Sequence, residues 1–207
     1  MPAYYLGEWD RVLEMAALVR AEWATRMLTR ASFAIDMAAP GAVLSARGDD
    51  AAAEEYFGIA HAMLPGEGDQ AAIEGVSMLR AEVLLHHRRY GEAARVTERL
   101  ARTWSWTRAS YIATRAEAHL LAGKRDPAMA IAAAEQAAGE NPYAVAVLRR
   151  TRAIADDDRD ELAAALAAFE GLGCIFQAAR TGWMLGGDER LAAMAAFERL
   201  GVPPPSD

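Results

Sequence analysis

The residues best suited to acid–base or metal chemistry are few and scattered. The 207-residue chain has four histidines, His61, His86, His87 and His119, and none belongs to an H-E-x-x-H pattern. Glu82 and His86 are four residues apart and can share a helix face, but one such pair supplies too few ligands for a metal ion. We interpret Glu82 and His86 as an ordinary polar pair.

Other motifs that could carry chemistry are incomplete. The acidic run at 156–160 lacks the glycine and the final glutamate of a calcium-binding loop, and it is better suited to capping a helix. The sequence has no Gly-x-Ser-x-Gly elbow and no phosphate-binding loop that ends in Gly-Lys. Cys174 lies among apolar residues, with no neighbour that would activate its thiol. The sequence therefore predicts no catalytic residue, no metal ligand and no cofactor.

The most distinctive local feature is a segment rich in arginine and tryptophan. Eight arginines and three glutamates lie from Arg80 to Arg115, a net charge of +5 within a chain of net charge -7. Tryptophan and arginine are enriched among interface hot spots. We therefore predict a partner-binding patch made of Arg102, Trp104, Trp106, Arg108, Tyr111 and Arg115. In the alternative interpretation, one tryptophan packs between helices and the arginines face solvent.

Composition excludes several classes of function. The acidic net charge argues against direct binding of nucleic acid, which favours basic surfaces. No apolar stretch reaches the roughly 18 to 20 residues that a membrane span requires, and the first residues do not resemble a signal peptide. The single cysteine rules out an internal disulfide and fits a reducing compartment. We expect a cytoplasmic protein that binds neither nucleic acid nor membrane.

The elements that must position these residues are predicted to be helices. Alanine, leucine, glutamate and arginine dominate, and the alternation typical of strands is missing. Helix-start signals recur at intervals of 30 to 41 residues, which bracket the roughly 34-residue tetratricopeptide period. The predicted starts are Trp9, Asp50, Tyr90, Arg125, Arg159 and Glu189. Asp126-Pro127 and Asn141-Pro142 should also begin helices, because a capping residue precedes a proline suited to the first turn.

A local repeat supports this organisation, since residues 167–173 recur in similar form at 195–201, an offset of 28 residues. We predict an all-α fold, a right-handed α-solenoid of tetratricopeptide-like helix pairs. It forms one domain, 1–207, with about five to six units, the first incomplete. That incomplete unit suggests a possible homodimer. The sequence also predicts a helix break near 38–41 and a core that includes Phe57, Leu84, Leu100, Ile131, Leu166, Phe169 and Leu191.

Three stretches carry a resemblance to a known family: Leu6-Gly7-Glu8-Trp9-Asp10, Arg47-Gly48-Asp49 and the region 162–203. Through them the chain resembles the tetratricopeptide-like region of large bacterial ATP-binding transcription regulators of the LuxR family, related to the maltose-regulon activator. The resemblance covers most of the chain. It implies a sensing or docking arm, while ATP binding and DNA binding do not carry over.

The predicted function is a non-catalytic helical-repeat binding module. It would be the effector-sensing or protein-docking arm of a bacterial transcription regulator, and its partner would be a protein or peptide segment or a small-molecule effector. The alternative is a free-standing scaffold or adaptor, and a more remote alternative is an enzyme with an unrecognised site.

Overall fold

A computed structural model of the chain describes residues 2–26, 31–64, 69–98, 105, 107–124 and 127–206. Within these ranges the protein has twelve helices and no strand, which confirms the predicted all-α class. The helices are α1 (Pro2–Tyr5), α2 (Trp9–Arg26), α3 (Ala31–Ala46), α4 (Asp50–Ala62), α5 (Gln70–His86), α6 (Tyr90–Val96), α7 (Arg108–Leu121), α8 (Pro127–Ala138), α9 (Pro142–Asp156), α10 (Arg159–Gly171), α11 (Ile175–Leu185) and α12 (Gly187–Leu200).

Several helices begin where the sequence predicts. The starts at Trp9, Asp50, Tyr90 and Arg159 are confirmed, whereas α12 begins at Gly187, two residues before the predicted Glu189. The predicted start at Arg125 lies outside the described residues.

Local capping explains why several of these starts could be predicted. The side chains of Asp49 and Asn141 accept hydrogen bonds from backbone N–H groups three residues further on, at 3.1 and 3.0 Å. The side chain of Asp158 accepts hydrogen bonds from the backbone N–H groups of Asp160 and Glu161 in α10, both at 3.0 Å. Each cap satisfies backbone donors that the first turn of a helix leaves open.

The predicted break near 38–41 is wrong, because α3 continues through Pro40. Pro40 is buried, and the next residue, Gly41, packs tightly against α4. A Cβ at Gly41 would lie 3.2 Å from the carbonyl oxygen of Ala53 and 3.2 Å from the ring of Phe57. Tertiary packing against α4 therefore stabilises a helix that proline would weaken in isolation.

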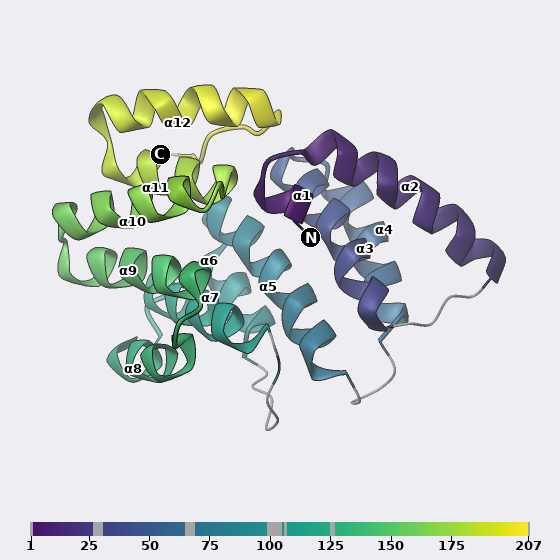
Figure 1. Cartoon of the computed structure of the whole chain (residues 1–207), viewed down its shortest axis with the longest axis horizontal. Helices are drawn as coiled ribbons and strands as arrows, with labels where there is room; N and C mark the ends of the chain where they lie inside the picture. Colours follow the sequence, from purple (N-terminus) through teal and green to yellow (C-terminus); the bar gives the residue numbers. More distant parts are fainter. Residues whose placement is uncertain are drawn as a thin grey trace.

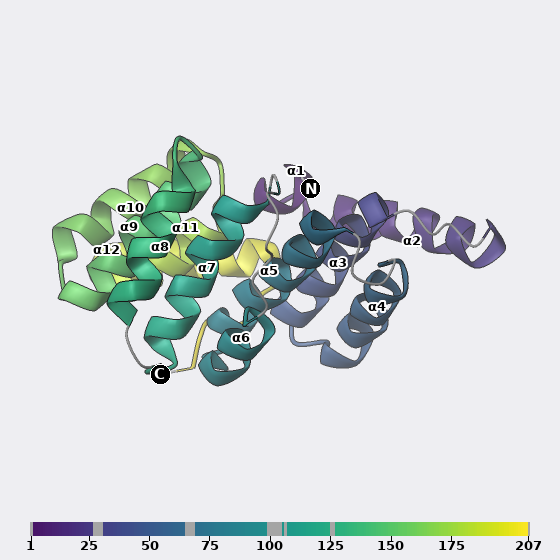
Figure 2. The same ribbon diagram turned by 90° about the horizontal axis from the view of Figure 1, so that it is seen from below.

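Neighbouring helices pack as consecutive pairs, namely α3 with α4, α5 with α6, α7 with α8, α9 with α10 and α11 with α12. The first helices of successive pairs also contact one another from α3 through α5 and α7 to α9. In Figure 1, α5 lies in the middle of the molecule, between α1 to α4 on one side and α7 to α12 on the other. The far end of α2 projects away from the body in both views (Figures 1 and 2).

The first residues of the chain pack against α11 and the end of α12. Trp9 is 1% exposed, and its ring lies 5.2 Å from that of Phe176 on α11. The turn between α1 and α2 depends on Gly7, which has φ +74°, and a Cβ there would lie 3.0 Å from Cδ1 of Ile175. Trp9 is therefore buried within its own chain rather than at an exposed end. An exposed first unit therefore no longer supports the predicted homodimer, which stays a prediction.

The predicted core residues divide into three groups. Phe57, Leu84 and Phe169 are buried as expected, while Ile131 and Leu166 are partly buried. Leu100 lies outside the described residues. The prediction for Leu191 is wrong, since its side chain is 65% exposed. It lies opposite the stripe of α12 that packs on the core, which consists of Ala193, Ala196, Phe197 and Leu200.

We expect Phe169→Ala to lower the free energy of unfolding by about 3 to 5 kcal/mol, because it leaves a cavity at a residue that is 0% exposed. Leu191→Ala is the matched control, with an expected change within about 0.5 kcal/mol. Urea denaturation of both variants measures the difference. Equal losses would contradict this placement of the two side chains.

Candidate functional site

One face of α5 carries two acidic residues into the interior. Glu74, Met78 and Glu82 are spaced four residues apart, so they lie along one stripe of the helix. Their exposed fractions are 0%, 3% and 1%. A buried carboxyl group requires hydrogen-bond donors or a positive partner, so the surroundings of each glutamate indicate what this face is built to hold.

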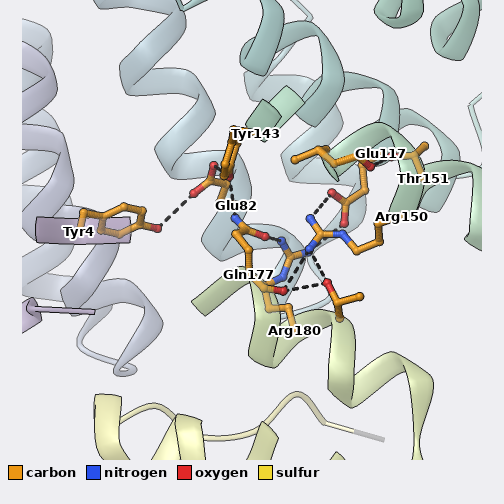
Figure 3. A network of polar contacts seen from close by, with 10 residues as sticks. Tyr4, Glu82, Glu117, Tyr143, Arg150, Thr151, Gln177 and Arg180 are labelled. Atoms are coloured by element: carbon orange, nitrogen blue, oxygen red, sulfur yellow. Dashed lines mark hydrogen bonds and ion pairs between the residues drawn. The ribbon is translucent and has the colours of Figure 1, made fainter. Parts of the chain in front are cut away.

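Glu82 accepts hydrogen bonds from two tyrosines that come from distant parts of the chain (Figure 3). The hydroxyl of Tyr4, on α1, donates to Oε2 at 3.2 Å, and the hydroxyl of Tyr143, on α9, donates to Oε1 at 2.5 Å. Burial raises the pKa of Glu82 to about 7, while the two hydroxyls and the nearby Arg180 and Arg150 oppose that rise.

A pair of buried arginines lies beyond this carboxyl group. Arg150 on α9 and Arg180 on α11 are each 1% exposed, and both bind Glu117 on α7. The nitrogen–oxygen distances are 2.7 Å from Arg150 Nη2 and 3.1 Å from Arg180 Nη2. Burial raises the pKa of Glu117, but the two arginines outweigh burial and hold it below its usual value.

Gln177 joins the two halves into one network. Its Nε2 donates to the hydroxyl of Tyr143 at 3.0 Å, and its Oε1 accepts from Nη1 of Arg180 at 2.8 Å (Figure 3). Arg150 Nη1 also donates to the hydroxyl of Thr181 at 3.0 Å. Polar contacts therefore run without interruption from α1 through α5, α9 and α11 to α7. Charged side chains in this interior position organise the packing of the helices and are inaccessible to a partner.

Glu74 forms a second buried cluster near the start of α7. Its Oε2 accepts hydrogen bonds from the hydroxyls of Ser105 and Thr107, the latter at 3.3 Å. Nη1 of Arg108 lies 3.8 Å from its Oε1. These contacts hold the segment before α7 against α5.

A cavity of about 370 Å³ lies on the same side of α5 as these clusters. Apolar or aromatic side chains form much of its wall, including Leu6, Met78, Leu172, Tyr5 and Tyr143. The rings of Tyr5 and Tyr143 are 5.0 Å apart. Three of the lining residues, Pro2, Tyr5 and Leu6, belong to α1 or directly follow it. The N-terminal helix therefore forms one wall of the cavity, and Glu82 holds that helix through Tyr4.

Three helices begin at this cavity. The residues that precede α7, α9 and α11 are Thr107, Asn141 and Cys174, and all three line it. Asn141 caps its own helix, whereas the side chains of Thr107 and Cys174 make no capping hydrogen bond. Burial raises the pKa of Cys174 to about 11, so its thiol stays neutral. The cavity therefore combines apolar walls with the positive ends of three helices.

The predicted binding patch is only partly described. Arg102, Trp104 and Trp106 lie outside the described residues. Tyr111 is 1% exposed and donates its hydroxyl to the backbone oxygen of Thr97 at 2.9 Å, so its side chain serves packing and is not presented to a partner.

The two remaining patch residues are half-buried on α7. Arg108 pairs with Glu74, as described above, and Nε of Arg115 is buried without a hydrogen-bond partner among the described residues. The structure thus brings Arg108 close to the cavity, because Thr107 and Ser110 on either side of it line the wall.

The predicted polar pair Glu82 and His86 is also rearranged. Both side chains are buried, but Glu82 binds tyrosines, and Nε2 of His86 lies 2.9 Å from the backbone oxygen of Pro203. Sequence reasoning missed the roles of Tyr4, Tyr143 and Gln177. The one available signal was in α11, where Gln177, Arg180 and Thr181 follow the spacing of a buried face.

Within the described ranges, no three histidine, cysteine or acidic side chains are grouped so that they could hold a metal ion. Among the same residues, no helix combines the length and hydrophobicity that a membrane span requires. In comparisons with known proteins, no family model, no curated protein and no solved structure matches this chain.

We expect Glu117→Gln to lower the free energy of unfolding by about 3 to 5 kcal/mol, since it leaves two buried arginines without their carboxylate. Glu135→Gln is the matched control. Glu135 pairs with Arg152 at the surface, where both side chains are largely solvated, and its loss should cost less than about 1 kcal/mol. Similar losses in the two variants, measured by urea denaturation, would contradict a structural role for the buried arginine pair.

The raised pKa of Glu82 has a consequence for stability. Folding raises it from the ordinary value of 4.5 to about 7, so the folded protein retains a proton that the unfolded chain releases. The stability that this retained proton contributes is fully present below 4.5, the pKa of Glu82 in the unfolded chain. It is lost as pH rises through about 7, the pKa of Glu82 in the folded protein. From pH 5 to pH 8 the parent should therefore lose about 2.5 kcal/mol relative to Glu82→Gln. Parallel pH profiles of unfolding free energy for the two proteins would show that Glu82 does not titrate in this way.

Proposed function

We propose that this protein is a non-catalytic helical-repeat binding module whose ligand is a small effector held in the cavity beside α5. The observation that carries the proposal is the cavity itself, because successive helices and α1 together build its wall. Its volume of about 370 Å³ is within the range of small-molecule sites, which run from roughly 300 to 1,000 Å³.

The repeat architecture belongs to the same proposal. The five consecutive helix pairs from α3/α4 to α11/α12 would be tetratricopeptide-like units of a right-handed solenoid. In that arrangement, equivalent positions of successive first helices fall on one face. The positions of Thr107, Asn141 and Cys174, each just before a first helix and each at the cavity, support it.

The biological setting follows from the sequence resemblance. A cavity lined by several successive helices suits the effector-sensing arm of a transcription regulator, because occupancy can alter the packing between repeats. The alternative setting is a free-standing scaffold or adaptor protein. The second candidate function is the docking of a partner protein on the exposed surface.

One observation favours docking. Large apolar side chains are exposed at both ends of the array, with Leu18 on α2 64% exposed and Leu191 on α12 65% exposed. Exposed apolar groups are frequent at protein interfaces but also occur singly on ordinary surfaces. The cavity beside α5, which several helices line, is therefore the stronger of the two observations.

Binding of the neutral fluorescent probe N-phenyl-1-naphthylamine tests the proposal. The parent should bind it saturably with increased fluorescence, and Ser110→Leu should weaken binding at least about tenfold by filling the cavity. Ser77→Leu, on α5 and outside the cavity lining, is the matched control. Leu6→Trp serves as a second filling variant if circular dichroism shows that Ser110→Leu unfolds.

Equal binding by the parent, the filling variants and the control would contradict a ligand site in this cavity. Loss of binding after Leu18→Glu or Leu191→Glu, with the filling variants unaffected, would instead assign the probe to the exposed apolar surface.

A further inference from the structure

The side chains around the cavity restrict the chemistry of its ligand, if the cavity is the ligand site of the proposed function. We infer that the ligand is an uncharged, mostly apolar molecule with a carbonyl-type hydrogen-bond acceptor, which Ser110 binds at the end where the helices begin. The argument rests on the charge of the wall, on the hydroxyl of Ser110 and on the orientation of the three helices.

Among the described residues, the wall carries no side chain that is ordinarily charged. Its polar members are the tyrosines, Thr107, Ser110, Asn141 and Cys174. Burial keeps the pKa of Tyr5, Tyr143 and Cys174 above the usual values, so these groups also stay neutral. An ionic ligand would lose its hydration without gaining a counter-charge in the wall, which is strongly unfavourable.

The buried glutamates behind the wall do not change this conclusion. Both oxygens of Glu82 already accept hydrogen bonds from tyrosines, and Oε2 of Glu74 accepts from Ser105 and Thr107. Oε1 of Glu74 accepts no hydrogen bond among the described residues, but it faces Nη1 of Arg108 at 3.8 Å. Neither glutamate lines the cavity, so a cationic ligand would find no carboxylate there to pair with. An anionic ligand would meet two nearby carboxyl groups, and the one on Glu82 is partly ionised near neutral pH.

Ser110 supplies an available hydrogen-bonding group. The residue is 9% exposed and lines the cavity, and its hydroxyl makes no hydrogen bond within the described part of the chain. A hydroxyl that lines a cavity and has no partner in the protein is available to a ligand or to water. This feature is independent of the helix ends and indicates a polar group on the ligand.

The orientation of the three helices indicates that the ligand group beside Ser110 is a hydrogen-bond acceptor. Ser110 lies in the first turn of α7, and α9 and α11 also begin at the cavity. N-terminal helix ends present N–H groups and a partial positive charge, and no side chain caps α7 or α11. The oxygen of an amide, ester or ketone accepts a hydrogen bond from the hydroxyl of Ser110 and carries the partial negative charge that the helix ends favour. It introduces no net charge.

Competition against N-phenyl-1-naphthylamine tests this inference with three probes that share an eight-carbon skeleton. Octanamide should displace the dye at a concentration about tenfold lower than octanoate or octylammonium, because only the amide enters without losing the hydration of a full charge. Ser110→Ala should weaken octanamide about 3- to 10-fold and leave the other two unchanged. Ser77→Ala is the matched control, and thermal melts verify folding.

The outcomes separate the inference from the proposed function. If the dye does not bind the parent, or binds equally to the cavity-filling variants, the proposed ligand site fails. If the dye binds in the cavity but octanoate or octylammonium competes as well as octanamide, the ligand class inferred here is wrong. Unchanged octanamide binding by folded Ser110→Ala overturns the role of Ser110.

Discussion

The desolvation of Glu82 is the constraint on which the arrangement of this protein depends. A carboxyl group in a water-free interior must find donors, and here the donors come from helices far apart in sequence. Tyr4 precedes Glu82 by 78 residues and Tyr143 follows it by 61 residues. The requirement of one side chain on α5 therefore fixes the position of α1 on one side and of α9 on the other.

The same requirement extends through Gln177 to the buried arginines. Glu117 neutralises one positive charge of the Arg150 and Arg180 pair, and the partly ionised Glu82 lies close enough to influence Arg180. Buried ionic networks contribute little net stability compared with apolar packing, but the loss of one member is costly. We therefore regard the network as a device that specifies how α7, α9 and α11 are placed relative to α5, and that placement creates the cavity.

Local features of the sequence were sufficient to predict the helices but not their assembly. Asp49 and Asn141 could be identified as caps because their partners are three residues away. The prediction of a helix break at Pro40 was wrong because packing against α4 stabilises α3, and no local sequence rule includes such a contact. Leu191 was misplaced because a large apolar residue was assigned to the core without testing whether it shares the buried stripe of its helix.

The candidate site was harder to predict than the fold, because it depends on contacts between residues that are far apart in the sequence. Tyr4, Glu82 and Tyr143 have no short-range relation, and only tertiary structure brings them together. The predicted patch drew on composition, namely the excess of arginine and tryptophan, and two of its described members, Arg108 and Tyr111, engage other residues of the chain. Exposed fractions and hydrogen-bond partners are properties of packing, so composition alone does not reveal them.

Amide hydrogen exchange of α1 tests the central claim most directly. A helix of only four residues ordinarily frays and exchanges quickly. If Glu82 holds α1 through Tyr4, then the amides of Leu6 and Glu8, which bond to Pro2 and Ala3, should exchange at rates close to those of α5. Tyr4→Phe should accelerate exchange there while α5 stays protected. Rapid exchange of Leu6 and Glu8 in the parent protein, with α5 protected, would contradict the account.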